Sequence, residues 1–443
     1  MKYLLSLVFF ITISFYTLSL GLDPYYSMVI LFASLAGGYM AMNIGANDVA
    51  NSVGPAVGSK TITLKWAIII AAIGNFSGAL IAGGDVVSTI KDGIIDISGF
   101  GGDTHMFIFA MISALVSAAI WLNIATYFKA PVSTTHSIVG GVMGAGVAAL
   151  GVKVVSWSTM GKIVASWVIS PVLGGIIAAI FLFFIKTTIL FKDDKIKSAQ
   201  KMVPIFVAIM SWAFSTYLIL KGLKHLIKLD FTQASIIGFI IAIIVYFVMS
   251  KVLKGKNHKI KNNRESINTL FSIPLIFAVA LLTFAHGAND VANAIGPLAG
   301  IYDAIVSGGI TGKASIPIWI MVIGGAGISI GLYLFGPRII KRVGGEITEL
   351  DQVRAFSIAL SAALTVIIAS QLGLPVSSTH IALGGIFGVG FLREYLDKKH
   401  NKKKEIHVKR DLIYKIIAAW LITVPVVAFL SGMVFLLIES LYL

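Results

Sequence analysis

The sequence contains no cysteine, and only 12% of its 443 residues are charged. The absence of cysteine excludes structural disulfides, thiolate metal sites and thiol nucleophiles. Because charge is scarce while 57% of the residues are hydrophobic, the chain has more apolar surface than one soluble core can bury. The composition therefore predicts a protein whose solvent is the lipid bilayer.

Long apolar stretches recur along the whole chain. A helix needs about 20 mostly apolar residues to cross the hydrocarbon core of a bilayer. The stretches are continuous and lack the alternation of barrel strands, so they predict an all-α polytopic membrane protein with about 10–12 transmembrane segments. They lie near residues 3–20, 25–43, 64–83, 104–126, 160–185, 202–220, 233–250, 270–286, 316–336, 352–371 and 413–441.

The first stretch, 3–20, follows a single lysine, as in either a signal peptide or a first span. It lacks a clear small-x-small cleavage site before Asp23, and a polytopic protein needs no separate signal. We therefore expect this segment to be retained as a span.

The net charge of +15 is concentrated in loops. Loops of this kind normally stay in the cytoplasm, which predicts a multi-pass protein of the cell (inner) membrane. No recognition module accompanies the basic runs, so no nucleic-acid partner is expected, whereas membrane lipid headgroups are natural partners of such loops. The clusters are Lys186, Lys192, Lys195, Lys197 and Lys201; Lys251, Lys254, Lys256, Lys259, Lys261 and Arg264; and the run from Arg393 to Arg410.

Two long motifs occur twice, in the same order. The sequence Gly-Ala-Asn-Asp-Val-Ala-Asn at 45–51 returns at 287–293, an offset of 242 residues. Pro-Val-Ser-Thr-Thr-His at 131–136 returns as Pro-Val-Ser-Ser-Thr-His at 375–380, an offset of 244. This repetition predicts two related halves. We divide the chain into a first transmembrane repeat at 1–186, linker spans and basic loops at 187–269, and a second repeat at 270–443, to which the last linker span can also belong.

The distribution of charge predicts that the halves are inverted. The loop at 151–159, after the first Pro-Val-Ser-Thr-Thr-His unit, holds a single lysine, whereas its counterpart carries the third basic cluster. Equivalent loops therefore lie on opposite sides of the membrane. Inverted repeats with interrupted helices are typical of secondary transporters, whose binding site lies near the midplane where the repeats meet.

The first motif places amide and carboxylate groups within or against apolar spans. An ionisable residue at that depth costs at least about 2.5 kcal/mol to insert, which suggests a partner ion or proton. Glycines and the prolines Pro55 and Pro297 are expected to interrupt the helices and free backbone carbonyls. Hard oxygen ligands of this kind suit a hard cation. The candidate cation-binding residues are Asn47, Asp48, Asn51, Asn289, Asp290 and Asn293.

An alternative interpretation is that these residues only cap broken helices. The spacing of Asn47 and Asn51 would place both amides on one helical face. The duplication of the motif, with a carboxylate in each copy, favours ion binding over capping.

The second motif places three hydroxyls directly after a proline, which is well tolerated in the first turn of a helix. Hydroxyls and free N–H groups at a helix start form an anion cradle. The glycine-rich segments that follow, 138–150 and 381–391, are expected to be re-entrant half-helices of helical hairpins. The candidate substrate contacts are Ser133, Thr134, Thr135, Ser377, Ser378 and Thr379. N-capping alone is the alternative, and His136 and His380 are expected to be local hydrogen-bond partners rather than ligands.

The paired motifs resemble those of the inorganic phosphate transporter (PiT) family, and the resemblance covers nearly the whole chain. It implies a symporter with an inverted-repeat helical fold, commonly oligomeric, that takes up inorganic phosphate with sodium or protons. It also implies that the six hydroxyl residues contact phosphate. The ion or substrate positions that it implies, where we favour sodium as the coupling ion, are Asn47, Asp48, Asn289 and Asp290.

The sequence departs from some members of that family. Glutamates of some animal members align with Asn75 and Ala359 here, and their large hydrophilic central domain is reduced to short basic loops. His286 precedes the second Gly-Ala-Asn-Asp unit, whereas Ile44 holds that position in the first. The two halves therefore need not bind identical ions.

These observations favour a secondary active transporter with no enzymatic activity and no cofactor besides coupling ions. Phosphate next to Asp48 and Asp290 would be repelled unless cations neutralised the carboxylates, and this repulsion would couple the two fluxes. A transporter of another oxyanion such as sulfate is the main alternative, because the same cradle distinguishes the two anions poorly. A passive anion channel and an intramembrane aspartate hydrolase are weaker alternatives.

Overall fold

The structure is a computed structural model that describes residues 2–127, 132–222, 229–255, 261–308, 316–346, 350–399, 407, 408 and 410–442. Pro131 of the second motif and parts of two basic clusters lie outside the described residues. These parts are Lys256, Lys259, the segment 400–406 and Lys409.

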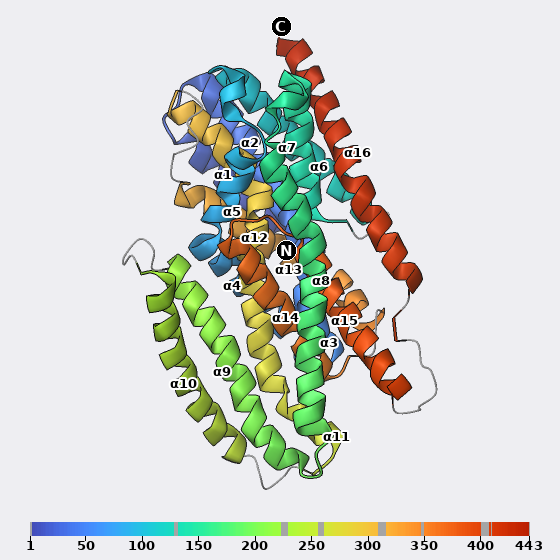
Figure 1. Cartoon of the computed structure of the whole chain (residues 1–443). Helices are drawn as coiled ribbons and strands as arrows, with labels where there is room; N and C mark the ends of the chain where they lie inside the picture. The colour runs from blue at the N-terminus through green and yellow to red at the C-terminus, as the bar shows by residue number, and fades with distance from the viewer. Residues whose placement is uncertain are drawn as a thin grey trace.

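The described residues contain helices and no β-strand, apart from one isolated bridge between Ile95 and Val155 (Figure 1). The short helical turns are η1 (Thr89–Gly93), η2 (Ile97–Phe100), η3 (Val152–Val154) and η4 (Lys186–Leu190). The α-helices are α1 (Lys2–Leu18), α2 (Pro24–Asn47), α3 (Val49–Gly58), α4 (Leu64–Ala82), α5 (Gly84–Ser88), α6 (Thr104–Tyr127), α7 (Thr134–Leu150), α8 (Trp157–Ile185), α9 (Lys195–Gly222), α10 (Phe231–Gly255), α11 (Arg264–Leu270), α12 (Ser272–Val306), α13 (Ile318–Glu346), α14 (Gln352–Gln371), α15 (Ser378–Lys399) and α16 (Arg410–Tyr442).

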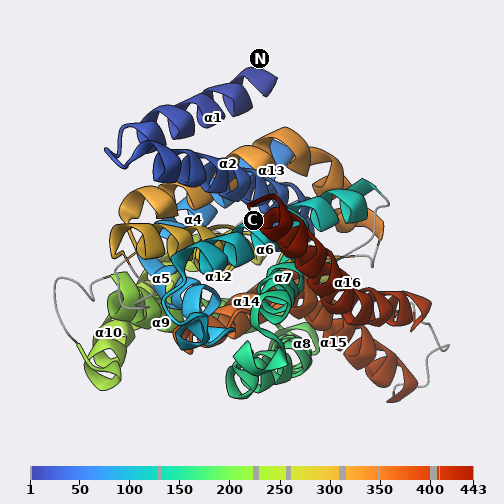
Figure 2. The ribbon, with the colours of Figure 1, turned by 90° about the horizontal axis from the view of Figure 1, so that it is seen from above.

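Ten helices of the described residues are long and apolar enough to cross a membrane. They coincide with ten of the eleven apolar stretches, which confirms the polytopic α-helical class. The remaining stretch forms α1, whose 17 residues span roughly 25 Å at 1.5 Å per residue. This helix lies at the edge of the bundle, where Phe9 and Ile13 pack against Gly38 of α2 (Figure 2). The retention of this segment as a span stays a prediction.

The helices pack in pairs that correspond when the two halves are exchanged. Helix α7 packs against α16 and α15 packs against α8, while α2 packs against α13 and α12 against α4. Glycines allow the close approach in both members of a pair. A Cβ on Gly144 would lie 2.1 Å from the Ala428 carbonyl oxygen, and one on Gly388 would lie 2.0 Å from that of Gly175. The same pattern of helix contacts therefore occurs in both halves, with the roles of the halves exchanged.

Corresponding helices run in opposite directions in Figure 1. Helix α8 ends at the bottom of the molecule beside α9, whereas α16 ends at the top, at the C-terminus. The predicted inversion of the repeats stays a prediction, and these directions support it. The linker helices α9 and α10 form a hairpin at the periphery, at a different edge of the bundle from α1 (Figure 2).

The prediction that Pro55 and Pro297 interrupt their helices is wrong. Helix α3 continues through Pro55 to Gly58, and α12 continues through Pro297 to Val306. The interruption in the first half lies instead at Asp48, between α2 and α3. A proline removes only one helical donor, so each ring leaves one carbonyl, that of Asn51 or Asn293, without its usual i+4 partner. Packing on all sides keeps both helices intact.

Helices α7 and α15 begin within the molecule, directly at the hydroxyl motifs. Ser133 and Ser377, next to their first residues, are both buried. Helix α15 is longer than the expected half-helix and continues to Lys399. The re-entrant path of these segments stays a prediction.

Candidate functional site

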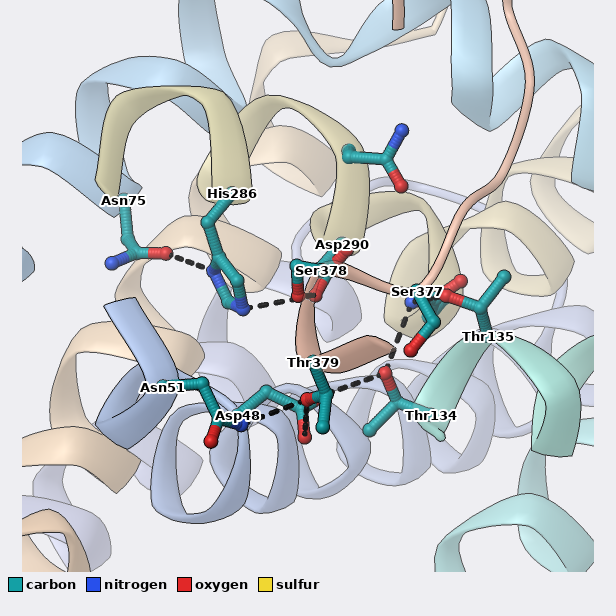
Figure 3. A network of polar contacts seen from close by, with 12 residues as sticks. Asp48, Asn51, Asn75, Thr134, Thr135, His286, Asp290, Ser377, Ser378 and Thr379 are labelled. Atoms are coloured by element: carbon teal, nitrogen blue, oxygen red, sulfur yellow. Dashed lines mark hydrogen bonds and ion pairs between the residues drawn. The ribbon is translucent and has the colours of Figure 1, made fainter. Parts of the chain in front are cut away.

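Asp48 lies at the break between α2 and α3 and is buried, with 3% of its surface exposed. The hydroxyl of Thr134 donates to its Oδ2 at 2.7 Å, and the hydroxyl of Thr379 approaches Oδ1 at 3.4 Å (Figure 3). These two threonines start α7 and α15, so one carboxylate contacts both copies of the hydroxyl motif.

Asp290 has a different environment in the middle of α12. Its Oδ2 accepts a hydrogen bond from the Ser378 hydroxyl at 2.8 Å and lies 2.9 Å from Nε2 of His286. The other ring nitrogen of His286 lies 2.5 Å from Oδ1 of Asn75 in α4 (Figure 3). The chain Asn75–His286–Asp290 is fully buried and orients the carboxylate toward α15.

Two amides cross between the halves of the chain. Asn51 of the first half donates to the Thr379 hydroxyl at 2.8 Å. Asn293 of the second half donates to the hydroxyls of Thr134 at 3.2 Å and Thr135 at 3.1 Å. Thr135 and Thr379 occupy equivalent positions of the repeated motif, as do the two asparagines. The polar network is therefore shared equally by both halves.

The serines that begin the hydroxyl motifs act as helix caps. Ser133 Oγ accepts from the backbone N–H of His136 at 3.2 Å, and Ser377 Oγ accepts from that of His380 at 3.3 Å. Capping, the alternative weighed for this motif, thus accounts for one hydroxyl in each copy. The remaining hydroxyls point into the network, where they contact Asp48, Asp290 and the asparagines.

The rings of His136 and His380 pack on aromatic side chains. His136 lies against Trp167 with ring centroids 3.8 Å apart, and His380 stacks on Trp420 at 3.5 Å. The two imidazoles meet edge to face at 4.7 Å. These contacts hold the starts of α7 and α15 next to each other and leave the hydroxyls to face the two aspartates.

The remaining two predicted residues lie elsewhere. Asn289 donates to Ser370 Oγ and to the Leu374 carbonyl, and its own oxygen accepts from the N–H of Val376. This side chain holds the segment that leads into α15. Asn47 is half-buried, and the hydrogen bonds of the described residues include none from its side chain. Among the described residues, neither side chain forms a hydrogen bond with Asp48, Asp290 or the hydroxyls of the second motif.

The arrangement is suited to a cation. One ligand atom from each of Asp48, His286 and Asp290 lies within 4.8 Å of the other two. Two carboxylates buried at such short range repel each other strongly when both are charged. In addition, Oδ1 of Asp290 and Oδ1 of Asn293 are buried without a hydrogen-bond donor among the described residues. Buried acceptors of this kind need a cation or a proton.

In the sequence, His286 and Asn75 stand out only as departures from the family pattern, which predicts neither their contact nor the contact of His286 with Asp290. The available signal was the spacing of His286 and Asp290, four residues apart, which puts both side chains on one face of α12. The contact with Asn75 joins residues 211 positions apart. Nothing in the local sequence encodes a contact between residues so far apart.

A family model, related sequences and a solved structure are all similar to this chain. The model of a family described as "Phosphate transporter family" matches residues 44–431. A "Putative phosphate permease" of Helicobacter pylori is 47% identical, over 98% of this chain and 94% of its own length. A protein of the same description from Pyrococcus abyssi is 38% identical, over 94% of this chain and 98% of its own length.

A solved structure is also similar. The protein titled "The sodium-dependent phosphate transporter" superposes with a TM-score of 0.86 and is 35% identical in sequence. The match covers 93% of this chain and 99% of the other. The similarity therefore extends over nearly the whole fold.

Proposed function

The chain belongs to the phosphate transporter family, and on this premise we propose that it imports inorganic phosphate together with sodium ions through the network around Asp48 and Asp290. The observation that carries this proposal is the pairing of buried carboxylates with the hydroxyls of both helix starts.

Sodium binding would change which acceptor the hydroxyls of Thr134 and Ser378 donate to. At present Thr134 and Ser378 donate to Asp48 and Asp290. A cation that takes these carboxylate oxygens as ligands competes with the hydroxyl donors. The hydroxyl hydrogens can then turn toward an anion held between α7 and α15. Cation binding would thus prepare the anion site, and the anion would stabilise the bound cations.

Charge makes the coupling obligatory in this scheme. A phosphate carries one or two negative charges near neutral pH, and two more lie on the aspartates. The buried set without cations is strongly repulsive, because a low local dielectric enlarges every interaction between charges. Two sodium ions and a phosphate dianion together carry no net charge, so this cargo adds no further charge to the site, whose remaining negative charge belongs to the two aspartates.

Sodium is favoured over the proton by the donor set. The free acceptor oxygens of Asp290 and Asn293, with the carbonyls left by Pro55 and Pro297, are hard ligands. The structurally similar protein is titled as sodium-dependent, which supports the same choice here. His286 next to Asp290 offers a proton-binding group, so proton coupling is the second candidate.

Opposed repeats provide a route for alternating access. The exchanged helix pairs α7–α16 and α15–α8 enclose the starts of α7 and α15 from the two halves. A site placed between inverted repeats can be exposed to either side by movement of one half against the other.

The test is uptake of labelled phosphate into proteoliposomes that contain the purified protein. An inward sodium gradient, an inward proton gradient and no gradient are compared, each with and without excess unlabelled sulfate. We expect accumulation that needs sodium and resists sulfate. Accumulation driven only by a proton gradient would show that the coupling ion is the proton and not sodium. Competition by sulfate would show that the substrate is a wider class of oxyanions than phosphate.

A further inference from the structure

A second buried polar cluster lies outside the central network. Lys91 of η1 forms an ion pair with Asp303 near the end of α12, with Nζ 2.9 Å from Oδ2. Asp92 lies at 3.9 Å from the same ammonium group. Lys91 and Asp303 are 3% and 7% exposed. Burying two charges is costly, so a pair at this depth calls for a role other than stability.

The ion pair lies at the wall of a cavity of about 310 Å³. Asp303 is 13 residues from Asp290 along the continuous helix α12, which corresponds to roughly 20 Å. The cavity therefore lies toward one end of α12, at a distance from the central network. Its lining consists of Lys91, Ala299, Tyr302, Asp303, Val306, Ser307, Ile316 and Pro317.

The turn η1 fills the space along α12 between the cavity and the network. A Cβ on Gly300 would lie 3.4 Å from the Lys91 side chain, and one on Gly296 would lie 2.5 Å from that of Ile90. Successive residues of η1 thus rest on glycines one turn apart. The π-helical form of this turn is rare and is frequently found at functional sites.

The same turn also contacts the segment that leads into the hydroxyl motif of α15. Thr89 donates a hydrogen bond of 2.7 Å to the carbonyl of Gly373, four residues before Ser377. Gly373 has a φ of +65°, a conformation that favours glycine. One short segment therefore connects the ion pair at the cavity with the chain that leads into α15.

We propose that η1 and the Lys91–Asp303 pair form a gate that separates the cavity from the central site on one side of the membrane. This inference rests on the proposed transport function. Opening of the ion pair frees η1 from α12, and loss of the Thr89–Gly373 bond frees the segment before α15. Oδ1 of Asp303 is buried without a hydrogen-bond donor among the described residues. One acceptor of the ion pair therefore lacks a hydrogen bond in the closed state, which favours opening.

The gate belongs to one side only. The counterpart of Asp303 at the 242-residue offset of the first motif is Thr61, which carries no charge. In addition, α3 ends at Gly58, whereas α12 continues to Val306. The ion pair is therefore not repeated in the other half, and the opposite face must close by other contacts.

The experiment uses the absence of cysteine. Ser377→Cys introduces a single thiol into the cradle, and its labelling by a membrane-impermeant methanethiosulfonate is timed from each side of the proteoliposomes. Labelling of Ser377→Cys alone is compared with labelling of the same variant after a further change. These changes are Lys91→Met, the charge swap Lys91→Asp plus Asp303→Lys, and Thr89→Val. Arg264→Met, which breaks an exposed pair with Asp351 at 3.1 Å, is the matched control.

We expect Lys91→Met to raise the labelling rate at least about tenfold from one side only, because a buried pair that loses one partner no longer holds the closed state. The charge swap should restore slow labelling, Thr89→Val should accelerate labelling from the same side, and Arg264→Met should change nothing. An unchanged rate in both Lys91→Met and Thr89→Val, or equal acceleration from both sides, would overturn the gate.

The two proposals fail separately. Absence of phosphate uptake by the unmodified protein would reject the proposed function. Because thiol labelling requires no transport, the labelling rates would still test the gate. Unchanged labelling together with intact uptake would reject the gate alone.

Discussion

The two aspartates of the site differ in what surrounds them, although they occupy equivalent positions of a repeated motif. Asp48 contacts the hydroxyls of Thr134 and Thr379, whereas Asp290 contacts Ser378 and the ring of His286. Ile44 stands where the first half would carry the histidine. The threonine hydroxyls that contact Asp48 carry no charge, whereas the imidazole gives Asp290 a direct neighbour that can itself carry a proton.

The first prediction concerns Asp48→Asn. This change removes the charge but keeps an oxygen for Thr134, so the fold should persist while the cation loses its strongest ligand. We expect the initial rate of sodium-dependent phosphate uptake to fall at least about tenfold, since hydrogen bonds and contacts of a charged group contribute roughly 1.5–3 kcal/mol. The measurement is uptake as a function of sodium concentration.

Asp23→Asn is the control for that prediction. Asp23 is the exposed cap of α2, and asparagine caps a helix about as well as aspartate. The control should retain the sodium dependence of the unmodified protein. If Asp48→Asn kept the same sodium activation curve, the carboxylate would have no part in coupling.

The residues of the site were largely predictable, but their partners were not. Repetition and polarity in apolar spans identified Asp48, Asp290 and the hydroxyl motifs. The same pattern could not separate Asn289, which holds the segment before α15, from Asn293, which crosses to Thr135. Their difference arises from which helix faces each amide, and that depends on contacts between residues far apart in the chain.

At the scale of helices, apolar length located the spans, yet it ended two of them too early. The stretch 25–43 stops before the first polar motif and 270–286 before the second, whereas α2 runs to Asn47 and α12 to Val306. Hydropathy drops where asparagine and aspartate begin. The helices nevertheless continue, because these side chains face one another inside the protein instead of facing lipid.

The second prediction concerns the glycines that set the distance between paired helices. In Gly388→Ala the new Cβ would lie 2.0 Å from the Gly175 carbonyl oxygen, so α15 must move away from α8. Overpacking of this kind costs typically about 1–3 kcal/mol. We expect a lower thermal unfolding temperature for the purified protein, and the same for Gly144→Ala in the equivalent pair.

Gly161→Ala in α8 is the matched control, since a Cβ there meets no atom within 4 Å. It should unfold at or slightly above the original temperature, because alanine favours a helix over glycine. Equal loss of stability in Gly161→Ala and Gly388→Ala would mean that the close approach of α8 and α15 is not what the glycine provides.

For the whole molecule, the decisive property is that neither half builds the site alone. Hydrogen bonds within a half join each aspartate to its own hydroxyl motif, and bonds from Asn51 and Asn293 join each half to the other. Any movement of one half against the other must therefore break or exchange the crossing bonds. Those bonds are the ones that a bound anion could replace.

The last prediction tests the inversion that alternating access requires. Val152, after α7, is 58% exposed, and Tyr395, near the end of α15, is 61% exposed. These residues lie at corresponding ends of equivalent helices, so inverted repeats place them on opposite sides of the membrane. Phe191, after α8, is exposed and lies between Lys186 and Lys192 of the first basic cluster, which should share its side with Tyr395.

Single substitutions Val152→Cys, Tyr395→Cys and Phe191→Cys in the cysteine-free chain separate the possibilities. With an impermeant thiol reagent applied to intact cells, we expect labelling of Val152→Cys only, and labelling of the other two only after the membrane is opened. If Val152→Cys and Tyr395→Cys reacted from the same side, the halves would be parallel. The site would then lack the opposed helices by which one carboxylate–hydroxyl pair is presented to each side in turn.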